Sequence, residues 1–371
     1  MRTEILKIIE GGLERNSEKV KSYARLMSEK LIDQHEDKFA SRILNLIESK
    51  SENVHPVYLD EFVKKPVDND SRLDMVEVTL SSELLDEIIL PEFAKNKIDN
   101  YVESLKAKDK FIKLGINLPE SLLLYGPPGC GKTSIAQYIS KQTELPLVTA
   151  KLDSLISSLL GNTAKNIRKV FDYAQERPCI LFLDEFDAIA KARDDGQEVG
   201  ELKRVVNSLL QNIDKFNSDS ILIAATNHEK LLDLAVWRRF STIIEIPKPS
   251  KVEIDQLLIN NLKVIDTDFL NDKKKREVIV GLLLGFSPAE IKSICISSIK
   301  QSVLKDEKCV LYPNFLYQLY SSINAYSSQN EIVLFLNKYG VSQMNISKIL
   351  DISQRQVRNI LENKGDDSKN E

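Results

Sequence analysis

Residues 122–133 of the chain read Leu-Leu-Leu-Tyr-Gly-Pro-Pro-Gly-Cys-Gly-Lys-Thr, and this stretch decides the fold. The apolar run predicts a buried strand, the glycine-rich segment predicts a tight loop, and the pattern of Ile135, Tyr138 and Ile139 predicts a helix. The segment Gly126–Thr133 matches the phosphate-binding pattern G-x-x-x-x-G-K-[ST]. A strand, a loop and a helix in this order form the context that the pattern requires, so we expect a phosphate site here.

The chemistry of this loop assigns a role to its residues. Glycines allow backbone N–H groups to wrap around phosphates at the positive end of the following helix. Lys132 is expected to reach the β- and γ-phosphate oxygens, and Thr133 is expected to bind Mg²⁺. The residues predicted to bind ATP are Gly126, Pro127, Pro128, Gly129, Cys130, Gly131, Lys132, Thr133, Ser134 and Asp184.

A second apolar run, residues 180–183, leads directly into Asp184 and Glu185. The two carboxylates are thereby predicted at the carboxyl end of a buried strand, where ligands bind in open α/β sheets. Asp184 is expected to hold Mg²⁺ with Thr133, and Glu185 to polarise the attacking water, a contribution of about 10²- to 10⁴-fold. The alternative is a strand that ends in a solvated acidic turn, and the phosphate loop upstream argues against it.

Short apolar runs alternate with amphipathic helical patterns through the middle of the chain, which is typical of a parallel sheet covered by helices. The predicted strands are residues 122–125, 147–150, 180–183, 221–225 and 243–246. We therefore expect an α/β fold with a parallel five-stranded sheet sandwiched by helices, followed by a small all-α lid. Alternation over residues 75–80 predicts one more short strand upstream.

Composition changes along the chain predict five segments. They are a mainly helical N-terminal region that selects a substrate or partner (1–83), a large α/β domain (84–249), a helical lid (250–328), a compact helical unit (329–363) and a disordered tail (364–371). Helical periodicity covers residues 3–49 and 84–111 within the first two segments.

The overall composition argues against several classes of protein. With 51 basic and 55 acidic residues the net charge is -4, unlike a chain coated throughout for nucleic acid or anionic membrane. Four widely spaced cysteines and three scattered histidines suggest neither a zinc site nor a secreted disulfide framework. No run approaches the roughly 20 apolar residues of a membrane span. We expect a soluble, cytoplasmic protein with no membrane partner.

From about residue 84 to residue 304 the sequence resembles the AAA family of AAA+ ATPases. Besides the phosphate loop and the run Leu183-Asp-Glu-Phe-Asp187, three segments match the family in order. Ala225-Thr-Asn227 resembles sensor 1, residues 231–240 resemble the arginine-finger segment, and Gly285-Phe-Ser-Pro-Ala-Glu290 resembles the G-F-S-G-A-D that opens a lid helix. The departures at Pro288 and Glu290 both suit a first helical turn.

This resemblance implies ATP hydrolysis by a homo-oligomeric ring, expected to be a hexamer. Asn227 would orient the hydrolytic water, and Arg238 or Arg239 would act on the ATP of the neighbouring subunit. The alternative for these two arginines is a solvated basic pair beside Trp237. The sequence leaves open which of the two is the finger.

Residues 157–167 align with the family's pore loop, where an aromatic, an aliphatic residue and a glycine grip polypeptide in the central channel. Leu159 stands at the aromatic position, followed by Leu160 and Gly161. Leucine can contact an extended chain but lacks the area and stacking of an aromatic ring. Threading of a protein substrate is therefore one interpretation, and ordinary packing at a helix end is the other.

Residues 343–360 resemble a helix-turn-helix. Ile346, Ile349 and Leu350 would face the core from the first helix, and Val357 and Ile360 from the second. Asp351 and Ile352 would form a turn that lacks the usual glycine, and Ser353 would cap the second helix. The outward face, able to contact DNA phosphates and bases, carries Gln354, Arg355, Gln356, Arg358 and Asn359. The unit is only weakly basic, so docking of a protein is the alternative.

Three functions fit these patterns. The leading one is an ATP-hydrolysing ring protein that remodels, unfolds or regulates a partner protein. The second is a DNA-associated AAA+ ATPase recruited through the C-terminal helix-turn-helix. The third is a nucleotide-gated adaptor that controls a separate effector such as a protease. Because Glu185 and Asn227 are both present, hydrolysis of ATP is expected in all three.

Overall fold

The structure is a computed structural model in which the chain divides into two units, Met1–Lys65 and Pro66–Glu371. The described residues are 7, 23–24, 26–28, 30–31, 65–66, 74–83, 88–116, 121–151, 163–187, 199–216, 220–232, 234–324 and 328–367. In the first unit the described residues between 7 and 31 are helical, as predicted. The rest of the helical pattern predicted for residues 3–49 lies outside the described residues.

The second unit contains a six-stranded sheet in the order β1-β3-β4-β5-β2-β6. Its strands are β1 (Glu77–Thr79), β2 (Ser121–Tyr125), β3 (Leu147–Lys151), β4 (Ile180–Asp184), β5 (Ile221–Thr226) and β6 (Thr242–Glu245). Strands β2 to β6 are the five predicted ones, and they pair in parallel. The strand predicted upstream, β1, pairs antiparallel with β3 at the edge, so the sheet has one strand more than the five-stranded prediction.

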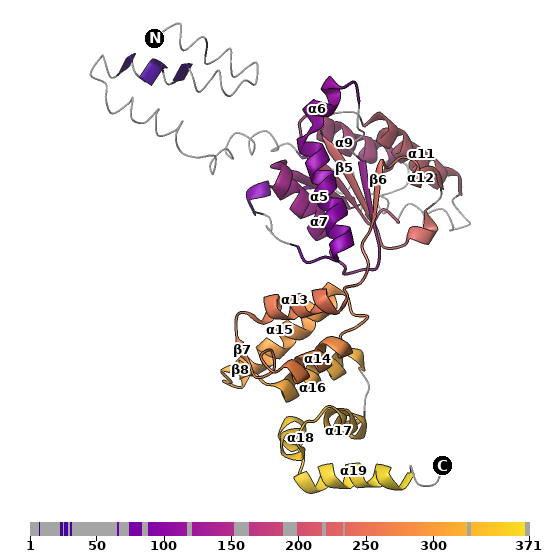
Figure 1. The fold of residues 1–371 in the computed structure, drawn as a ribbon. Coiled ribbons are helices and arrows are strands. Elements are labelled where there is room, and N and C mark those ends of the chain that lie inside the picture. The colour runs from indigo at the N-terminus through magenta and orange to yellow at the C-terminus, as the bar shows by residue number, and fades with distance from the viewer. Residues whose placement is uncertain are drawn as a thin grey trace. The chain divides into compact units, whose positions relative to one another are not determined.

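Helices cover the sheet (Figure 1). Helices α5 (Glu92–Lys106) and α7 (Lys132–Thr143) share a hydrophobic cluster with β2, β4 and β5. Helices α9 (Thr163–Gln175) and α11 (Val199–Lys215) pack on each other, and the Phe171 and Phe216 rings meet edge to face at 5.6 Å. Because neighbours bury the sheet on both faces, its strands read as continuous apolar runs.

Two short helices and two 3₁₀ turns lie between the main elements. Helix α6 (Lys108–Lys113) follows α5, and α12 (Leu234–Trp237) lies between β5 and β6. The 3₁₀ turns are η1 (Ser81–Glu83) and η2 (Glu229–Leu231). Helix α5 begins at Glu92, later than the predicted start at residue 84, because Pro91 occupies its N-cap position. Proline has no backbone N–H to continue a helix from upstream.

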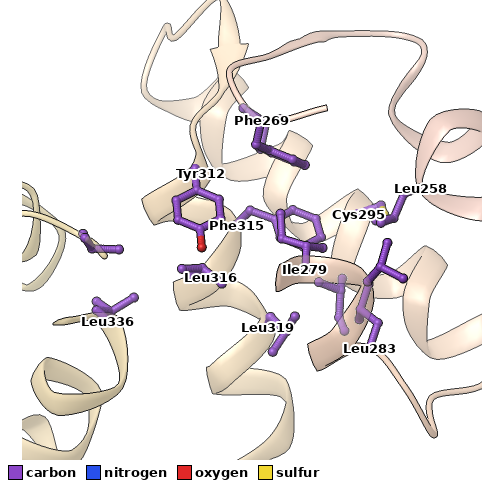
Figure 2. Packing of buried hydrophobic residues seen from close by; sticks show 14 of the residues in the cluster. Leu258, Phe269, Ile279, Leu283, Cys295, Tyr312, Phe315, Leu316, Leu319 and Leu336 are labelled. Carbon is purple, nitrogen blue, oxygen red and sulfur yellow. The ribbon is translucent and has the colours of Figure 1, made fainter. Parts of the chain in front are cut away.

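The lid consists of α13 (Lys251–Leu262), α14 (Lys273–Leu282), α15 (Pro288–Leu304) and α16 (Tyr312–Ile323). It also contains a parallel pair of two-residue strands, β7 (Asp266–Thr267) and β8 (Cys309–Val310), and is therefore not all helical as predicted. Two residues are too few to produce a readable alternation in the sequence. Figure 2 shows the lid core, in which Phe269 and Phe315 lie 5.1 Å apart between ring centroids.

The C-terminal helices α17 (Gln329–Lys338), α18 (Gln343–Leu350) and α19 (Gln354–Asp367) pack onto the lid. A single hydrophobic cluster joins Leu316 of α16 to Leu336, Ile346 and Val357 of this unit, and Figure 2 shows Leu336 beside Leu316. The lid and the C-terminal unit thus share one core. Helix α19 continues to Asp367, into the segment predicted to be a disordered tail.

Three further features concern the described residues alone. None of the helices among them is long and apolar enough to cross a bilayer. They hold no group of three His, Cys, Asp or Glu side chains that could bind a metal ion. All four cysteines are described and free, and burial raises the pKa of Cys179 to about 11 and of Cys295 to about 12.

Candidate nucleotide-binding site

Three strands deliver their loops to one edge of the sheet. Strand β2 ends at Tyr125, β4 at Asp184 and β5 at Thr226. Strand β5 lies between the other two and is parallel to both, so the three carboxyl ends meet at the same edge. The structure therefore brings together the phosphate loop, the two carboxylates and Asn227.

The glycines of the phosphate loop adopt conformations that other residues rarely reach. Gly126, Gly129 and Gly131 have φ angles of 145°, 73° and 91°. A Cβ atom at Gly126 would lie 2.1 Å from the Ile246 carbonyl oxygen. One at Gly129 would lie 2.8 Å from the Ser287 Oγ. The loop can therefore follow this path only with glycine at Gly126 and Gly129.

Helix α7 begins at Lys132, with Gly131 as its N-cap residue. The first N–H groups of a helix lack partners within the helix and carry a partial positive charge, so they form an anion site. Of the other predicted loop residues, Pro127 and Ser134 are half-buried, Pro128 is exposed and Cys130 is buried. The pKa of the Cys130 thiol is raised, mainly because the thiol is buried.

Lys132 is almost fully buried, with 7% of its surface exposed. Its Nζ donates hydrogen bonds to the carbonyl oxygens of Gly126 at 2.7 Å and Pro127 at 2.9 Å. Burial lowers the pKa of this amine, and the negative charges of Asp184 and Asp187 oppose that shift. The ammonium is held by neutral carbonyls, which are weaker acceptors than phosphate oxygens.

Thr133 and Asp184 meet where a magnesium ion is expected. The Thr133 Oγ1 donates to the Asp184 Oδ2 at 3.2 Å, which joins the start of α7 to the end of β4. Both groups are hard oxygen donors of the kind that Mg²⁺ binds beside phosphates. These residues fit the ion and its nucleotide.

Glu185 follows Asp184 in an unusual backbone conformation. Its φ angle is 54°, in the left-handed region, and its N–H donates to the Asp184 Oδ1 at 2.9 Å. A non-glycine residue in this region costs about 1–3 kcal/mol and is most often found at functional sites. The side chain is exposed, and its backbone directly follows Asp184 of the Thr133–Asp184 pair.

Asp187 ties the turn after β4 to the end of β5. This carboxylate is 3% exposed and accepts from the Thr226 Oγ1 and the Asn227 N–H, both at 3.3 Å. The Phe186 N–H adds a bond to the Ala225 carbonyl at 2.8 Å. Asp187 was not among the predicted site residues. The signal that could have identified it is its place as a third acidic residue in the strand-end run.

Arg238 and Arg239 have different environments. The Arg238 side chain is exposed, and its guanidinium has no hydrogen-bond or ion-pair partner among the described residues. Arg239 forms a bidentate ion pair with Asp214, in which Nε donates to Oδ1 at 2.8 Å and Nη2 donates to Oδ2 at 3.1 Å. The neighbouring Trp237 meets the Tyr125 ring edge to face at 5.3 Å. Within its own chain, Arg238 is therefore solvent-exposed and Arg239 is held by Asp214.

The lid segment 285–290 reaches the phosphate loop. Ser287 caps α15 and exchanges hydrogen bonds with Glu290 in a capping box, and Pro288 is the first helical residue. Pro288 and Glu290, which differ from the G-F-S-G-A-D pattern, thus both lie in the first helical turn, as expected. The Ala289 N–H donates to the Gly129 carbonyl at 3.2 Å. Hydrogen bonds from Ser287 lower the pKa of Glu290. The start of this lid helix is therefore in direct contact with the nucleotide loop.

The remaining predicted sites lie elsewhere. Residues Leu159, Leu160 and Gly161 of the predicted pore loop lie outside the described residues. The five residues predicted for DNA contact, Gln354, Arg355, Gln356, Arg358 and Asn359, are all exposed on α19. Asp351 has a φ angle of 52° and supplies the left-handed turn that glycine usually provides.

One of these five side chains is already in use. The Gln356 Oε1 accepts from the Ser353 N–H and Oγ, each at 2.9 Å, and the backbone N–H of Gln356 donates to the Ser353 Oγ at 3.2 Å. This is a capping box at the start of α19. Gln356 is thus committed to the helix start.

A strand-loop-helix phosphate site at the carboxyl edge of a mainly parallel sheet defines a P-loop nucleotide-binding protein. A family model described as "ATPase family associated with various cellular activities (AAA)" matches residues 122–248. The uncharacterized AAA family ATPase y4kL of Sinorhizobium fredii is 35% identical over 297 residues, which are 78% of this chain and 88% of that protein. The chain therefore belongs to the AAA family of ATPases.

Two other relatives share the ATPase part of the chain. The ATP-dependent zinc metalloprotease FtsH of Rhodothermus marinus is 34% identical over 249 residues, 65% of this chain and 35% of that protein. The proteasome-activating nucleotidase of Methanococcus vannielii is 37% identical over 201 residues, 52% of this chain and 48% of that protein. The chain thus spans less than half the length of either of these two proteins.

Proposed function

We propose that the chain is a Mg²⁺-dependent ATPase that works as a ring of identical subunits, expected to be a hexamer, and remodels, unfolds or regulates a partner protein. The observation that carries the proposal is the meeting of Lys132, the Thr133–Asp184 pair, Glu185 and Asn227 at one sheet edge. The relatives named a metalloprotease and a proteasome-activating nucleotidase support a protein as the partner.

Within one subunit the residues divide the work. The phosphate loop and Lys132 bind the β- and γ-phosphates, with Lys132 exchanging its two carbonyl acceptors for phosphate oxygens. Bound Mg²⁺, held through Thr133 and Asp184, would neutralise charge on the transferring phosphoryl group. Glu185 accepts a proton from the attacking water, and Asn227, held at its backbone by Asp187, orients that water.

Between subunits, Arg238 is the finger that completes the neighbour's site. It is exposed and has no side-chain partner among the described residues, whereas Arg239 is bound to Asp214 within its own chain. An arginine finger stabilises negative charge in the transition state and contributes about 10³- to 10⁵-fold. The site of each subunit is then incomplete until a second copy supplies Arg238.

The parts that meet the partner protein are assigned from the sequence. Leu159, Leu160 and Gly161 would contact polypeptide in the channel, and the N-terminal region would select it. The free cysteines are in keeping with a reducing, cytoplasmic location. A nucleotide-gated adaptor for a separate effector uses the same site, so it differs from remodelling only in what the ring contacts.

The proposal is tested with Glu185→Gln, which keeps the Asp184 metal site but removes the base. We expect ATP binding to persist while turnover falls by about 10²- to 10⁴-fold. Glu103→Gln, an exposed change on α5, is the control and should keep normal turnover. Phosphate release and nucleotide binding are measured on the same samples, and proteins retained by Glu185→Gln with ATP are identified. Unchanged turnover in Glu185→Gln would remove the catalytic assignment.

A second candidate is a DNA-associated ATPase. The arrangement of α18, the left-handed Asp351 and α19 favours it, because α19 exposes Arg355 and Arg358. Duplex affinity should then fall with salt and fall again in Arg355→Ala/Arg358→Ala. Anisotropy of a labelled duplex measures both effects. If the variant binds as well as the full chain, α19 is a protein-docking element.

A further inference from the structure

The segment that carries Arg238 has little structure of its own. Helix α12 is four residues long, Leu234–Trp237, which is one turn. A single turn does not hold its geometry without contacts from elsewhere, because nucleation of a helix is unfavourable. The direction in which Arg238 leaves this turn must therefore be set by its neighbours.

Arg239 supplies the main contact on one side. All three of its nitrogen atoms are used, since Nε and Nη2 bind Asp214 and Nη1 donates to the Ala235 carbonyl at 2.6 Å. The last bond satisfies a carbonyl of the one-turn helix that has no partner within the helix. Asp214 thus fixes the guanidinium that closes α12, and it does so from the last turn of α11.

Serines hold the other side of the segment. The Ser121 Oγ donates to the Arg239 carbonyl at 3.2 Å, and the Ser241 Oγ donates to the Ser121 carbonyl at 2.7 Å. These bonds attach the chain beyond Arg239 to the start of β2. Between them, Asp214 and the serines immobilise the residue that directly follows Arg238.

We propose that Asp214 is a positioning residue for the arginine finger: through Arg239 it orients Arg238 toward the nucleotide of the neighbouring subunit. The inference rests on the proposed trans action of Arg238. In this proposal Asp214 acts entirely through its bidentate ion pair with Arg239, and not through a contact of its own with the nucleotide. No sequence pattern assigns Asp214 to the site, because it lies in the ordinary polar face of an amphipathic helix.

The ion pair does not act by stabilising the whole fold. The Arg239 and Asp214 side chains are 27% and 49% exposed, and pairs this exposed contribute little to global stability. Breaking the pair should therefore leave the protein folded and change only the local geometry. Displacement of a reacting group by about 1 Å can cost roughly 100-fold in rate.

The experiment combines subunits with different defects in the full-length protein. Lys132→Ala has an inactive phosphate loop but keeps the arginine finger. Arg238→Ala keeps the phosphate loop but lacks the finger. Asp214→Asn should lower turnover about 10-fold, and mixing it with Lys132→Ala should restore activity, because the normal finger then faces the normal loop. Mixing it with Arg238→Ala should restore nothing, since both partners lack a working finger.

Two matched variants control for the chemistry of the change. Asp172→Asn removes another exposed ion pair, Arg168 Nε to Asp172 Oδ2 at 3.7 Å on α9, and should keep full turnover. Arg239→Lys keeps the charge but loses the bidentate geometry, and should fall between the normal chain and Asp214→Asn. Thermal unfolding of every variant confirms that it is folded.

The outcomes separate the two proposals. Recovery of Asp214→Asn with Arg238→Ala instead of Lys132→Ala would place Asp214 on the phosphate-loop side and overturn the inference, and so would normal turnover of Asp214→Asn. Failure of Arg238→Ala to recover with Lys132→Ala would instead contradict trans action by Arg238. If Arg239→Ala is as inactive as Arg238→Ala while Asp214→Asn is normal, Arg239 is itself a finger and needs no support from Asp214.

Discussion

The nucleotide site and the C-terminal unit α17–α19 both correspond to recognisable sequence patterns, but their residues are arranged differently in the structure. At the nucleotide site, Lys132 binds loop carbonyls, Thr133 binds Asp184, and Asp187 binds the end of β5. On α19 the predicted contact residues are exposed side chains of a single helix, and Gln356 bonds to Ser353 at the start of that helix. The nucleotide site is thus formed by residues from several strands, whereas the predicted contact residues of α19 lie on one helix surface.

The difference shows what each kind of pattern can establish. Polar groups from distant segments that satisfy one another at a sheet edge define the ligand's chemistry, because charge, acceptors and backbone conformation must all fit it. A polar helix face fits water, a phosphate backbone or another protein equally well. The nucleotide site therefore carries the proposed function, and the C-terminal unit carries an alternative.

The sharpest test of this comparison is a pair of glycine substitutions. Gly126→Ala would place a Cβ 2.1 Å from the Ile246 carbonyl oxygen and should abolish nucleotide binding or destabilise the large domain. In the C-terminal unit Gly340 also has a positive φ angle, 80°, but open space surrounds the position of an added Cβ. Gly340→Ala is therefore expected to cost only the backbone strain of about 1–2 kcal/mol. Nucleotide binding and thermal unfolding compare them. Normal ATP binding by Gly126→Ala would break the comparison.

A smaller effect is expected from two aspartates that fix turns. Asp187→Ala leaves the Thr226 hydroxyl and the Asn227 N–H without this acceptor, which should cost about 1–3 kcal/mol and lower turnover more than nucleotide affinity. Asp351→Ala should destabilise its turn by a similar amount but leave turnover unchanged. Steady-state kinetics with binding measurements separate the two. Equal loss of turnover in both variants would show that the regions are not functionally distinct.

Much of the sheet and the nucleotide site could be predicted from the sequence, because each buried strand is a continuous apolar run and the loop residues are adjacent. The Asp214–Arg239 pair could not, since nothing in a sequence says which carboxylate of α11 meets which of two adjacent arginines. The shared core of the lid and the C-terminal unit was missed for a similar reason. An amphipathic face such as that of Leu336 and Ile346 predicts burial without naming the surface it is buried against.

The capping boxes of α15 and α19 give the next comparison. Ser287→Ala and Ser353→Ala each remove an N-cap and should cost about 1 kcal/mol. Only Ser287→Ala should also weaken ATP binding, because α15 bonds to the phosphate loop through the Ala289 N–H. Titration of nucleotide against both variants measures the contrast. Weaker ATP binding by Ser353→Ala would show that the C-terminal unit reaches the site through the shared core.

The smallest effect is a pH dependence confined to one of these boxes. Hydrogen bonds from Ser287 lower the pKa of Glu290 in the folded state, so its stabilising contribution is present above about pH 4.3 and is lost as the pH falls through the lowered value. Glu290→Gln keeps an acceptor but does not titrate, as Gln356 does not. The unfolding temperature of the unsubstituted chain should approach that of Glu290→Gln as the pH falls below about 4. A gap that does not change with pH would contradict this.

The central claim is that each ATP site is completed by Arg238 of a second copy, and its most direct test is the turnover per chain measured against protein concentration. The mass of the assembly is measured on the same samples, so that monomers and rings are distinguished. We predict that turnover per chain is low for the monomer and rises to a plateau as rings form, while Arg238→Ala forms rings but stays low. Equal turnover per chain in monomers and rings would contradict the account, because the site would then be complete within one subunit.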